Sequence, residues 1–324
     1  MRTTGFRWAA FFSCCLLTCS LALGQAFPAK PIKLVLPFAP GGAMDAVARP
    51  ISEAFLKATG QPLVIENVGG AGGLVGAAQV VRAPPDGYSL LMASNGQISI
   101  APYLNIPLPY NPQTSLLPII NIATNPVILY AGGKTSFRSL QDVVSEAKRR
   151  PGEISFAHPG SASLGHLSLK LFAQQAGVRF NNIGYKGAGP ALVDVASGEV
   201  QLVFTHISTA QPYVLSGRVR PIAVASDRRL AQLPEVPTFA EAGLPGVNVS
   251  LWVGLMAPAG TSTANIATIA RSIDESLRTP EMKSRLEAQG FEIQGGTPRD
   301  FSEFITEDRE RWRKLAATVD MNAN

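Results

Sequence analysis

Two segments of the chain combine proline, glycine and hydroxylated residues at a point where a buried strand meets a helix. They are Pro37-Phe38-Ala39-Pro40-Gly41-Gly42-Ala43-Met44-Asp45 and, in the second half, His158-Pro159-Gly160-Ser161-Ala162-Ser163-Leu164-Gly165-His166. Glycines let the backbone approach a ligand closely, and the N–H groups at a helix start carry partial positive charge. Each segment predicts a seat for a carboxylate or phosphate, with a plain strand-to-helix turn or simple capping by Ser161 and Ser163 as the alternative. Two such seats facing one another would form a clamp.

Alternating short apolar runs and helix-length amphipathic segments surround both seats. The order strand, helix, strand, helix, strand is typical of a parallel sheet with helices on both faces. In the first half the expected elements are Ile32–Phe38, Ala43–Thr59, Leu63–Val68, Leu74–Ala83 and Ser89–Ser94. In the second half they are Val127–Tyr130, Ser139–Arg149, Ile154–Ala157, Ser163–Ala176, Ile183–Tyr185, Ala188–Ser197, Val200–Phe204, Thr209–Ser216, Arg220–Ala225, Val249–Met256, Ser262–Leu277, Glu281–Gln289 and Pro298–Val319.

The long apolar runs Ile119–Tyr130 and Val249–Pro258 are interpreted as strands that cross between two lobes. We therefore expect an α/β fold of two lobes, each with a mostly parallel sheet flanked by helices, joined by two crossing strands. Lobe one would comprise residues 27–126 and 253–324, and lobe two residues 127–252. The spacing alone equally permits two tandem domains.

The N-terminal segment has the pattern of a signal peptide. Arg2 and Arg7 precede an uncharged stretch from Trp8 to Leu23, and small residues follow up to Ala26. We expect residues 1–26 to be removed after Ala26 and the mature chain to reach the periplasm. Processing as a lipoprotein anchored at Cys19 is the alternative. No later segment approaches the roughly 18–20 apolar residues that a membrane-spanning helix needs.

Composition excludes several function classes. Cys14, Cys15 and Cys19 all lie in the expected signal peptide, so the mature chain would have no disulfide, thiolate nucleophile or cysteine-ligated metal. Removing Arg2 and Arg7 lowers the formal charge from +5 to +3, without a dense basic cluster. This is not the footprint of a nucleic-acid-binding protein.

Further motifs carry a specific resemblance. They are Pro31-Ile32-Lys33-Leu34-Val35 before the first seat, Glu66-Asn67, Gly70-Ala71-Gly72-Gly73, Pro85-Asp86-Gly87-Tyr88, His166-Leu167, Tyr185-Lys186-Gly187, Leu233-Pro234-Glu235-Val236-Pro237-Thr238 and Ala257-Pro258-Ala259-Gly260-Thr261. Together with the seats, they make the chain resemble the substrate-binding component of tripartite tricarboxylate transporters, the Bordetella uptake gene family. The resemblance extends from about Pro28 to Trp312.

The resemblance implies a type II periplasmic binding protein, with lobes that close like a Venus flytrap. It implies a small carboxylate ligand (a di- or tricarboxylate, an amino acid or an aromatic acid), a two-subunit membrane permease as partner, a monomer, and neither cofactor nor catalysis. It places the ligand against the loops Phe38 to Met44 and Pro159 to Ser163, with Ser94, Asn95 and Thr205 at strand ends facing the same cleft. The full set of expected ligand-binding residues is Phe38, Ala39, Pro40, Gly41, Gly42, Ala43, Met44, Ser94, Asn95, Pro159, Gly160, Ser161, Ala162, Ser163 and Thr205.

The sequence departs from the family pattern at the seats. Met44 stands where Thr or Ser is common, Ala162 replaces a usual glycine, and His158 replaces a usual Ser. Thr205-His206 follows Phe204 where Asp is frequent. These departures favour an aromatic or less polar carboxylate and a cationic rim, while the roles of His158 and His206 stay open.

Other functions have weaker support. The glycines from Gly70 to Gly76 lack the G-x-G-x-x-G spacing of a dinucleotide site, and no G-x-S-x-G elbow of a secreted hydrolase is present. The three histidines lack H-x-x-x-H spacing, so no metal site is expected. A ligand-sensing role in a signalling system is the main alternative to transport.

Overall fold

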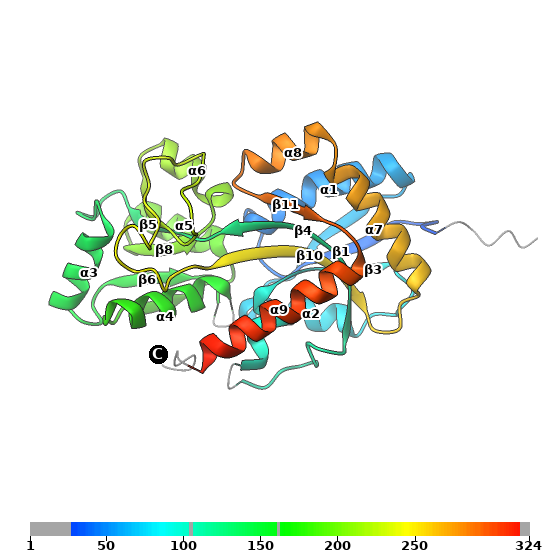
Figure 1. Cartoon of the computed structure of the whole chain (residues 1–324), viewed down its shortest axis with the longest axis horizontal. Coiled ribbons are helices and arrows are strands. Elements are labelled where there is room, and N and C mark those ends of the chain that lie inside the picture. The colour runs from blue at the N-terminus through cyan, green and yellow to red at the C-terminus, as the bar shows by residue number, and fades with distance from the viewer. Residues whose placement is uncertain (1–26, 104–105, 161–162, 318–324) are drawn as a thin grey trace, which may run out of the picture.

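The computed structural model describes residues 27–103, 106–160 and 163–317, which form two α/β lobes lying side by side (Figure 1). Lobe one is built on a six-stranded sheet with the strand order β11-β4-β10-β3-β1-β2. Its strands are β1 Ile32–Leu36, β2 Leu63–Asn67, β3 Ser89–Ser94, β4 Leu116–Pro126, β10 Ser250–Pro258 and β11 Glu292–Gly295. Its helices are α1 Ala43–Thr59, α2 Leu74–Val81, α7 Thr263–Leu277, α8 Pro280–Glu287 and α9 Pro298–Ala316, with short turns η1 Ala71–Gly73, η2 Gly96–Ile100 and η3 Ala101–Tyr103.

Lobe two is built on a five-stranded sheet with the order β7-β6-β8-β5-β9. Its helices cover the sheet at the left of Figure 1. Its strands are β5 Ile128–Gly132, β6 Ser155–His158, β7 Asn181–Gly184, β8 Leu202–Thr205 and β9 Val219–Val224, and its helices are α3 Leu140–Arg149, α4 Leu164–Ala176, α5 Ala188–Ser197 and α6 Ile207–Leu215.

The expected α/β class with two sheets and flanking helices is confirmed, and both sheets are mixed. In lobe one β1 pairs in parallel with β2 and β3, whereas β10 runs antiparallel to β3 and β4. In lobe two β6 is parallel to β7 and β8, and β5 is antiparallel to β8 and β9. The antiparallel pairs arise where the chain changes lobes, because a crossing strand enters the second sheet from the opposite direction.

The two lobes are joined through β4 and β10, which lie together along the middle of Figure 1. Only Val127 separates β4 from β5. Its N–H donates to the Val249 carbonyl (3.1 Å), its carbonyl accepts from Ala225 N–H (2.9 Å), and Val249 N–H donates to the Ala225 carbonyl (3.0 Å). The pairing of Ser250 with Pro126 starts the sheet of lobe one slightly before residue 253.

Apolar spacing explains the packing of both lobes. Val47, Ile51 and Phe55 recur every four residues on α1 and are fully buried against the sheet of lobe one. Lobe two is centred on phenylalanines, with Phe156 and Phe204 5.3 Å apart between ring centres. Burial of each such ring contributes about 1.5–3 kcal/mol to folding. No helix among the described residues is long and apolar enough to cross a membrane.

Candidate functional site

A small cavity of about 60 Å³ lies between the lobes, which is room for a few ordered waters. The strand ends of both sheets and the helices that follow them surround it. Its lining residues are Leu36, Phe38, Ala39, Gly42, Ala43, Met44, Asp45, Asn67, Ser94 and Leu251 from lobe one, and Val127, Pro159, Ser163, Leu164, Gly165, Ala188, Phe204, Thr205 and His206 from lobe two and the connection.

The structure brings most of the expected ligand-binding residues together. Phe38, Ala39, Gly42, Ala43, Met44, Ser94, Pro159, Ser163 and Thr205 all line the cavity. Pro40, Gly41 and Gly160 lie beside it on the same loops and are not among its lining residues. Ser161 and Ala162 lie outside the described residues.

Asn95 is turned away from the cavity. It is buried, its Oδ1 accepts from Trp252 N–H (3.0 Å), and its Nδ2 donates to the Ser250 carbonyl (3.2 Å). Asp308 of α9 accepts from the Trp252 indole N–H (2.7 Å) in the same network. The structure thus places Asn95 in a connection between β3, β10 and α9 rather than with the lining residues.

The first seat has the predicted strand-to-helix geometry. Gly42 is the N-cap of α1 and its backbone is extended (φ −91°, ψ 178°), with no side chain capping the helix. Asp45 in the first turn is buried, and its Oδ2 accepts from the Gly41 N–H (2.5 Å). Asp45 therefore braces the loop, while α1 has no side-chain cap on its first N–H groups.

Three helices of lobe two also begin at the cavity. Ala188, at the start of α5, and His206, the N-cap of α6, both line it, and neither helix has a side-chain cap. The third, α4, is capped by Ser163, whose Oγ accepts from His166 N–H (3.3 Å) and donates to the Gly160 carbonyl (2.6 Å). Helix α6 starts two residues earlier than the sequence predicted, which brings His206 to the site.

Most helices away from the cavity have a side-chain cap; α2, whose N-cap is Gly73, is an exception. Ser139 and Asp142 form a capping box at α3, and Thr297 and Asp300 form one at α9. The contrast matters because each uncapped helix start leaves N–H groups free and carries the equivalent of about half a positive charge. Four helix starts from two lobes therefore surround one cavity, three of them without a side-chain cap.

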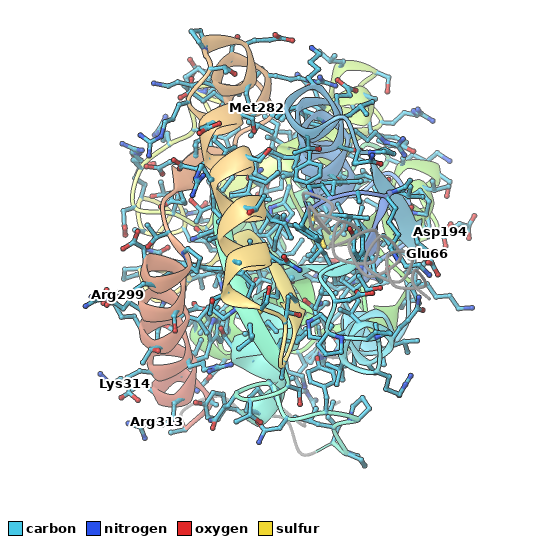
Figure 2. All side chains as sticks on the ribbon, turned by 90° about the vertical axis from the view of Figure 1, so that its right-hand side faces the viewer. Glu66, Asp194, Met282, Arg299, Arg313 and Lys314 are labelled. Carbon is cyan, nitrogen blue, oxygen red and sulfur yellow. The ribbon has the colours of Figure 1, made fainter. Side chains whose placement is uncertain are left out.

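The groups that could attract an anion to this cavity are backbone N–H groups at helix starts rather than cationic side chains, and Asp45 is the acidic residue among its described lining residues. No described lining residue is a lysine or an arginine. Figure 2 shows Arg299, Arg313 and Lys314 of α9 projecting outward from the helix, and none of them lines the cavity. An anion in this cavity would be held by N–H groups at helix starts.

The two buried histidines do not form the cationic rim that the sequence suggested. Burial lowers the pKa of His206 to about 4, and burial, with a smaller electrostatic contribution from the neighbouring His166, lowers the pKa of His158 to about 4. Both rings are therefore neutral near pH 7. His206 Nδ1 lies 3.1 Å from the Pro126 carbonyl. Because that carbonyl only accepts, Nδ1 carries the proton and Nε2 is left as an acceptor.

Two polar atoms at the cavity have no partner among the described residues, namely Asp45 Oδ1 and Thr205 Oγ1. Both are buried and belong to lining residues, so each is available to a polar group of a ligand or to a water. Beside these and the polar residues Asn67, Ser94, Ser163 and His206, the lining is largely apolar, with side chains of Leu36, Phe38, Met44, Val127, Leu164, Phe204 and Leu251. A guest with an anionic group and a largely apolar body fits this lining.

The lobes touch one another directly beside the cavity. Ala39 N–H of lobe one donates to the Lys186 carbonyl of lobe two (3.3 Å). A Cβ atom built on Gly160 would lie 2.8 Å from Gly72 N, and one built on Gly187 would lie 3.2 Å from Ala39 N. The cleft is therefore closed, with backbone of one lobe against backbone of the other.

Sequence reasoning missed several lining residues. Asn67, at the end of β2, donates through Nδ2 to the Phe38 carbonyl (3.0 Å) and so fixes the first seat. Ala188 and His206 stand between a strand and a helix, the same signal that identified the two seats, and could have been found by it. Within the described residues no group of three histidine, cysteine or acidic side chains could hold a metal ion.

Comparison with known proteins bears on this geometry. A family model described as "Tripartite tricarboxylate transporter family receptor" matches residues 47–321. The solved structure of the periplasmic binding protein BugD is 32% identical in sequence, with a TM-score of 0.86, and the match covers 90% of this chain and 98% of that one.

Two solved structures from Rhodopseudomonas palustris contain small carboxylates. Rpa4515 with adipate is 32% identical, with a TM-score of 0.87, and the match covers 90% of this chain and 99% of Rpa4515. MatC with bound malate is 32% identical, with a TM-score of 0.86, and the match covers 90% of this chain and 100% of MatC.

Proposed function

The chain belongs to the tripartite tricarboxylate transporter receptor family, whose members are periplasmic solute-binding proteins, and on that premise we propose that it captures a small carboxylate between its lobes for a membrane permease. The family and its structural neighbours are binding proteins rather than enzymes, which confirms the expectation of binding without catalysis. We further propose that the protein is exported with removal of residues 1–26, which lie outside the described residues, and acts as a monomer with a two-subunit permease.

The convergence of four helix starts on one cavity carries this proposal. Charge-assisted hydrogen bonds contribute roughly 1.5–3 kcal/mol each. Four or five of them, less the cost of ordering the ligand and closing the lobes, reach the about 8 kcal/mol of a micromolar complex. Adipate and malate in the relatives support a carboxylate, and the apolar walls around Phe38 and Phe204 favour one with a largely apolar body.

The proposal is tested with the purified protein and a panel of carboxylates that includes adipate and malate. Thermal shift identifies binders and isothermal titration calorimetry measures their Kd. A ligand at 100 times its Kd should stabilise the fold by about 2.7 kcal/mol. The neutral diamide of each active acid serves as the control. An equal shift with the diamides, or no shift with any carboxylate, would overturn the proposal.

A pair of variants tests the site itself. Ala188→Asp places a carboxylate at the first residue of α5, where it faces the cavity, and should weaken binding at least tenfold by repelling the anion. Val193→Asp adds the same charge on the same helix, at a side chain that is 51% exposed and outside the lining. This control should bind as the wild type does.

A further inference from the structure

The turn that follows β3 has an unusual backbone. Gly96–Ile100 forms a π-helical turn directly after Ser94 and Asn95, and all of its residues are buried. Such turns are rare and recur at functional sites because they reorient a side chain within a short stretch. Here the turn directs the side chain of Gln97 back toward the cleft.

Every polar atom of the Gln97 side-chain amide is used. Oε1 accepts from the Ser94 N–H (3.0 Å) and from the Ser94 hydroxyl (2.9 Å), while Nε2 donates to the Gly72 carbonyl (2.9 Å). The residue is fully buried, so a lost partner would not be replaced by bulk water. Gln97 therefore joins β3 to the turn η1 through one rigid planar group.

The Ser94 end of this connection is part of the ligand cavity. Because its hydroxyl proton is donated to Gln97, the Ser94 oxygen presents only lone pairs to the cavity. Ser94 thus accepts a hydrogen bond from a ligand donor or from a bridging water, rather than donating directly to a carboxylate. The hydrogen bond to Gln97 therefore determines that Ser94 acts as an acceptor toward the cavity.

The Gly72 end of this connection belongs to the surface of lobe one that contacts lobe two in the closed cleft. Gly72 N is the atom that a Cβ on Gly160 would approach to 2.8 Å across the cleft. A Cβ on Gly73 would lie only 2.2 Å from Gln97 Nε2, so the turn is packed directly on the amide. The position of η1 against lobe two is consequently set by the Gln97 side chain.

We propose that Gln97 is a positioning residue, which couples the ligand-facing hydroxyl of Ser94 to the surface of η1 that meets Gly160 when the lobes close. This coupling rests on the proposed function in that the cavity is a ligand site. Gln97 need not touch the ligand. Through one side-chain amide, it fixes Ser94 as an acceptor toward the cavity and fixes the position of η1 against lobe two.

Two substitutions remove both ends of the connection or the Gly72 end alone. Gln97→Met keeps the side-chain length and removes both sets of hydrogen bonds. Gln97→Glu retains an acceptor for Ser94 and loses the donor to Gly72. Tyr110→Phe is the matched control, because it removes the bond from the Tyr110 hydroxyl to the Gln97 backbone carbonyl (3.0 Å) without changing the amide.

Closure is measured by fluorescence energy transfer between dyes on cysteines introduced at Val64 and Leu215, which are 51% and 82% exposed in opposite lobes. Residues 27–324 contain no cysteine, so labelling is specific. Binding is measured by calorimetry with adipate as the probe. We expect Gln97→Met and Gln97→Glu to shift the distance distribution toward open lobes, and to raise the Kd for adipate at least tenfold. Tyr110→Phe should leave both unchanged while lowering the melting temperature.

A purely structural role would lower the melting temperature of the Gln97 variants and leave the interlobe distances and the adipate Kd of the folded molecules within twofold of the wild type. That result would overturn the proposal. If the wild type binds no carboxylate, the proposed function fails separately. The interlobe distances and the hydrogen exchange at Gly72 and Gly73 then decide whether Gln97 positions η1. Wild-type distances and exchange rates in Gln97→Met would overturn the positioning role. More open lobes with faster exchange in Gln97→Met would support it.

Discussion

Replacing Gly160 by alanine should hold the lobes apart. Gly160 has φ +118°, and a Cβ atom there would lie 2.8 Å from Gly72 N and 3.2 Å from Gly72 Cα. Both neighbours are backbone atoms and cannot rotate away, so the lobes must separate or the loops must shift. Overpacking of this kind costs about 1–3 kcal/mol, which corresponds to a loss of ligand affinity of roughly 5- to 150-fold.

The same substitution also strains the backbone, because φ +118° is readily adopted only by glycine and holding an L-residue in such a sparsely populated region costs roughly 1–3 kcal/mol. Gly177→Ala separates the two effects. Gly177 ends α4 at φ +62° and has no heavy atom within 4 Å of a built Cβ. Both variants should lose stability in chemical denaturation, and only Gly160→Ala should weaken carboxylate binding and enlarge the molecule in small-angle X-ray scattering. Wild-type affinity and shape in Gly160→Ala would refute the reasoning.

Two further predictions concern stability. Because the pKa values of His158 and His206 are lowered from 6.5 to about 4, the unfolded chain takes up protons first on acidification. The unfolding free energy should be unaffected by these groups above about pH 6.5 and should fall between pH 6.5 and 4, by up to roughly 3 kcal/mol per histidine. A His206→Asn variant should show a shallower fall of unfolding free energy with pH. Equal slopes in the variant and the wild type would contradict the assignment. Asp308→Leu should cost about 1–3 kcal/mol in denaturant unfolding because the buried Trp252 indole N–H loses its acceptor, and an unchanged midpoint would contradict this.

Local pattern was sufficient to predict much of the fold. Helix α1 has the predicted bounds because its apolar residues recur at helical spacing and Gly60 ends it in the left-handed conformation (φ 72°). The strand β3 also has its predicted bounds, set by the turn before it and the apolar run within it. The short strand β11 was not predicted, because its four residues are exposed or half-buried and pair with β4 from far along the chain.

The candidate site was predicted where it depends on strand-to-helix loops, and less well where it depends on distant partners. Phe38 to Met44 contains the lining of the first seat because proline and glycine fix that loop locally. Asn95 follows a strand in the same way, yet its direction is decided by Trp252, which is 157 residues away. The π-helical turn at Gln97 was equally hidden, since its geometry is supported by the bond to Gly72, 25 residues earlier.

The single-residue passage from β4 to β5 constrains how the molecule can move. Val127, Ala225 and Val249 bind one another through backbone hydrogen bonds, so the two interlobe connections behave as one ribbon two strands wide. Such a ribbon bends and twists readily but cannot shear or lengthen without breaking those bonds. We therefore expect the lobes to open and close chiefly by bending or twisting of this ribbon. The membrane permease proposed as partner would then have to distinguish only an open from a closed orientation of one lobe relative to the other.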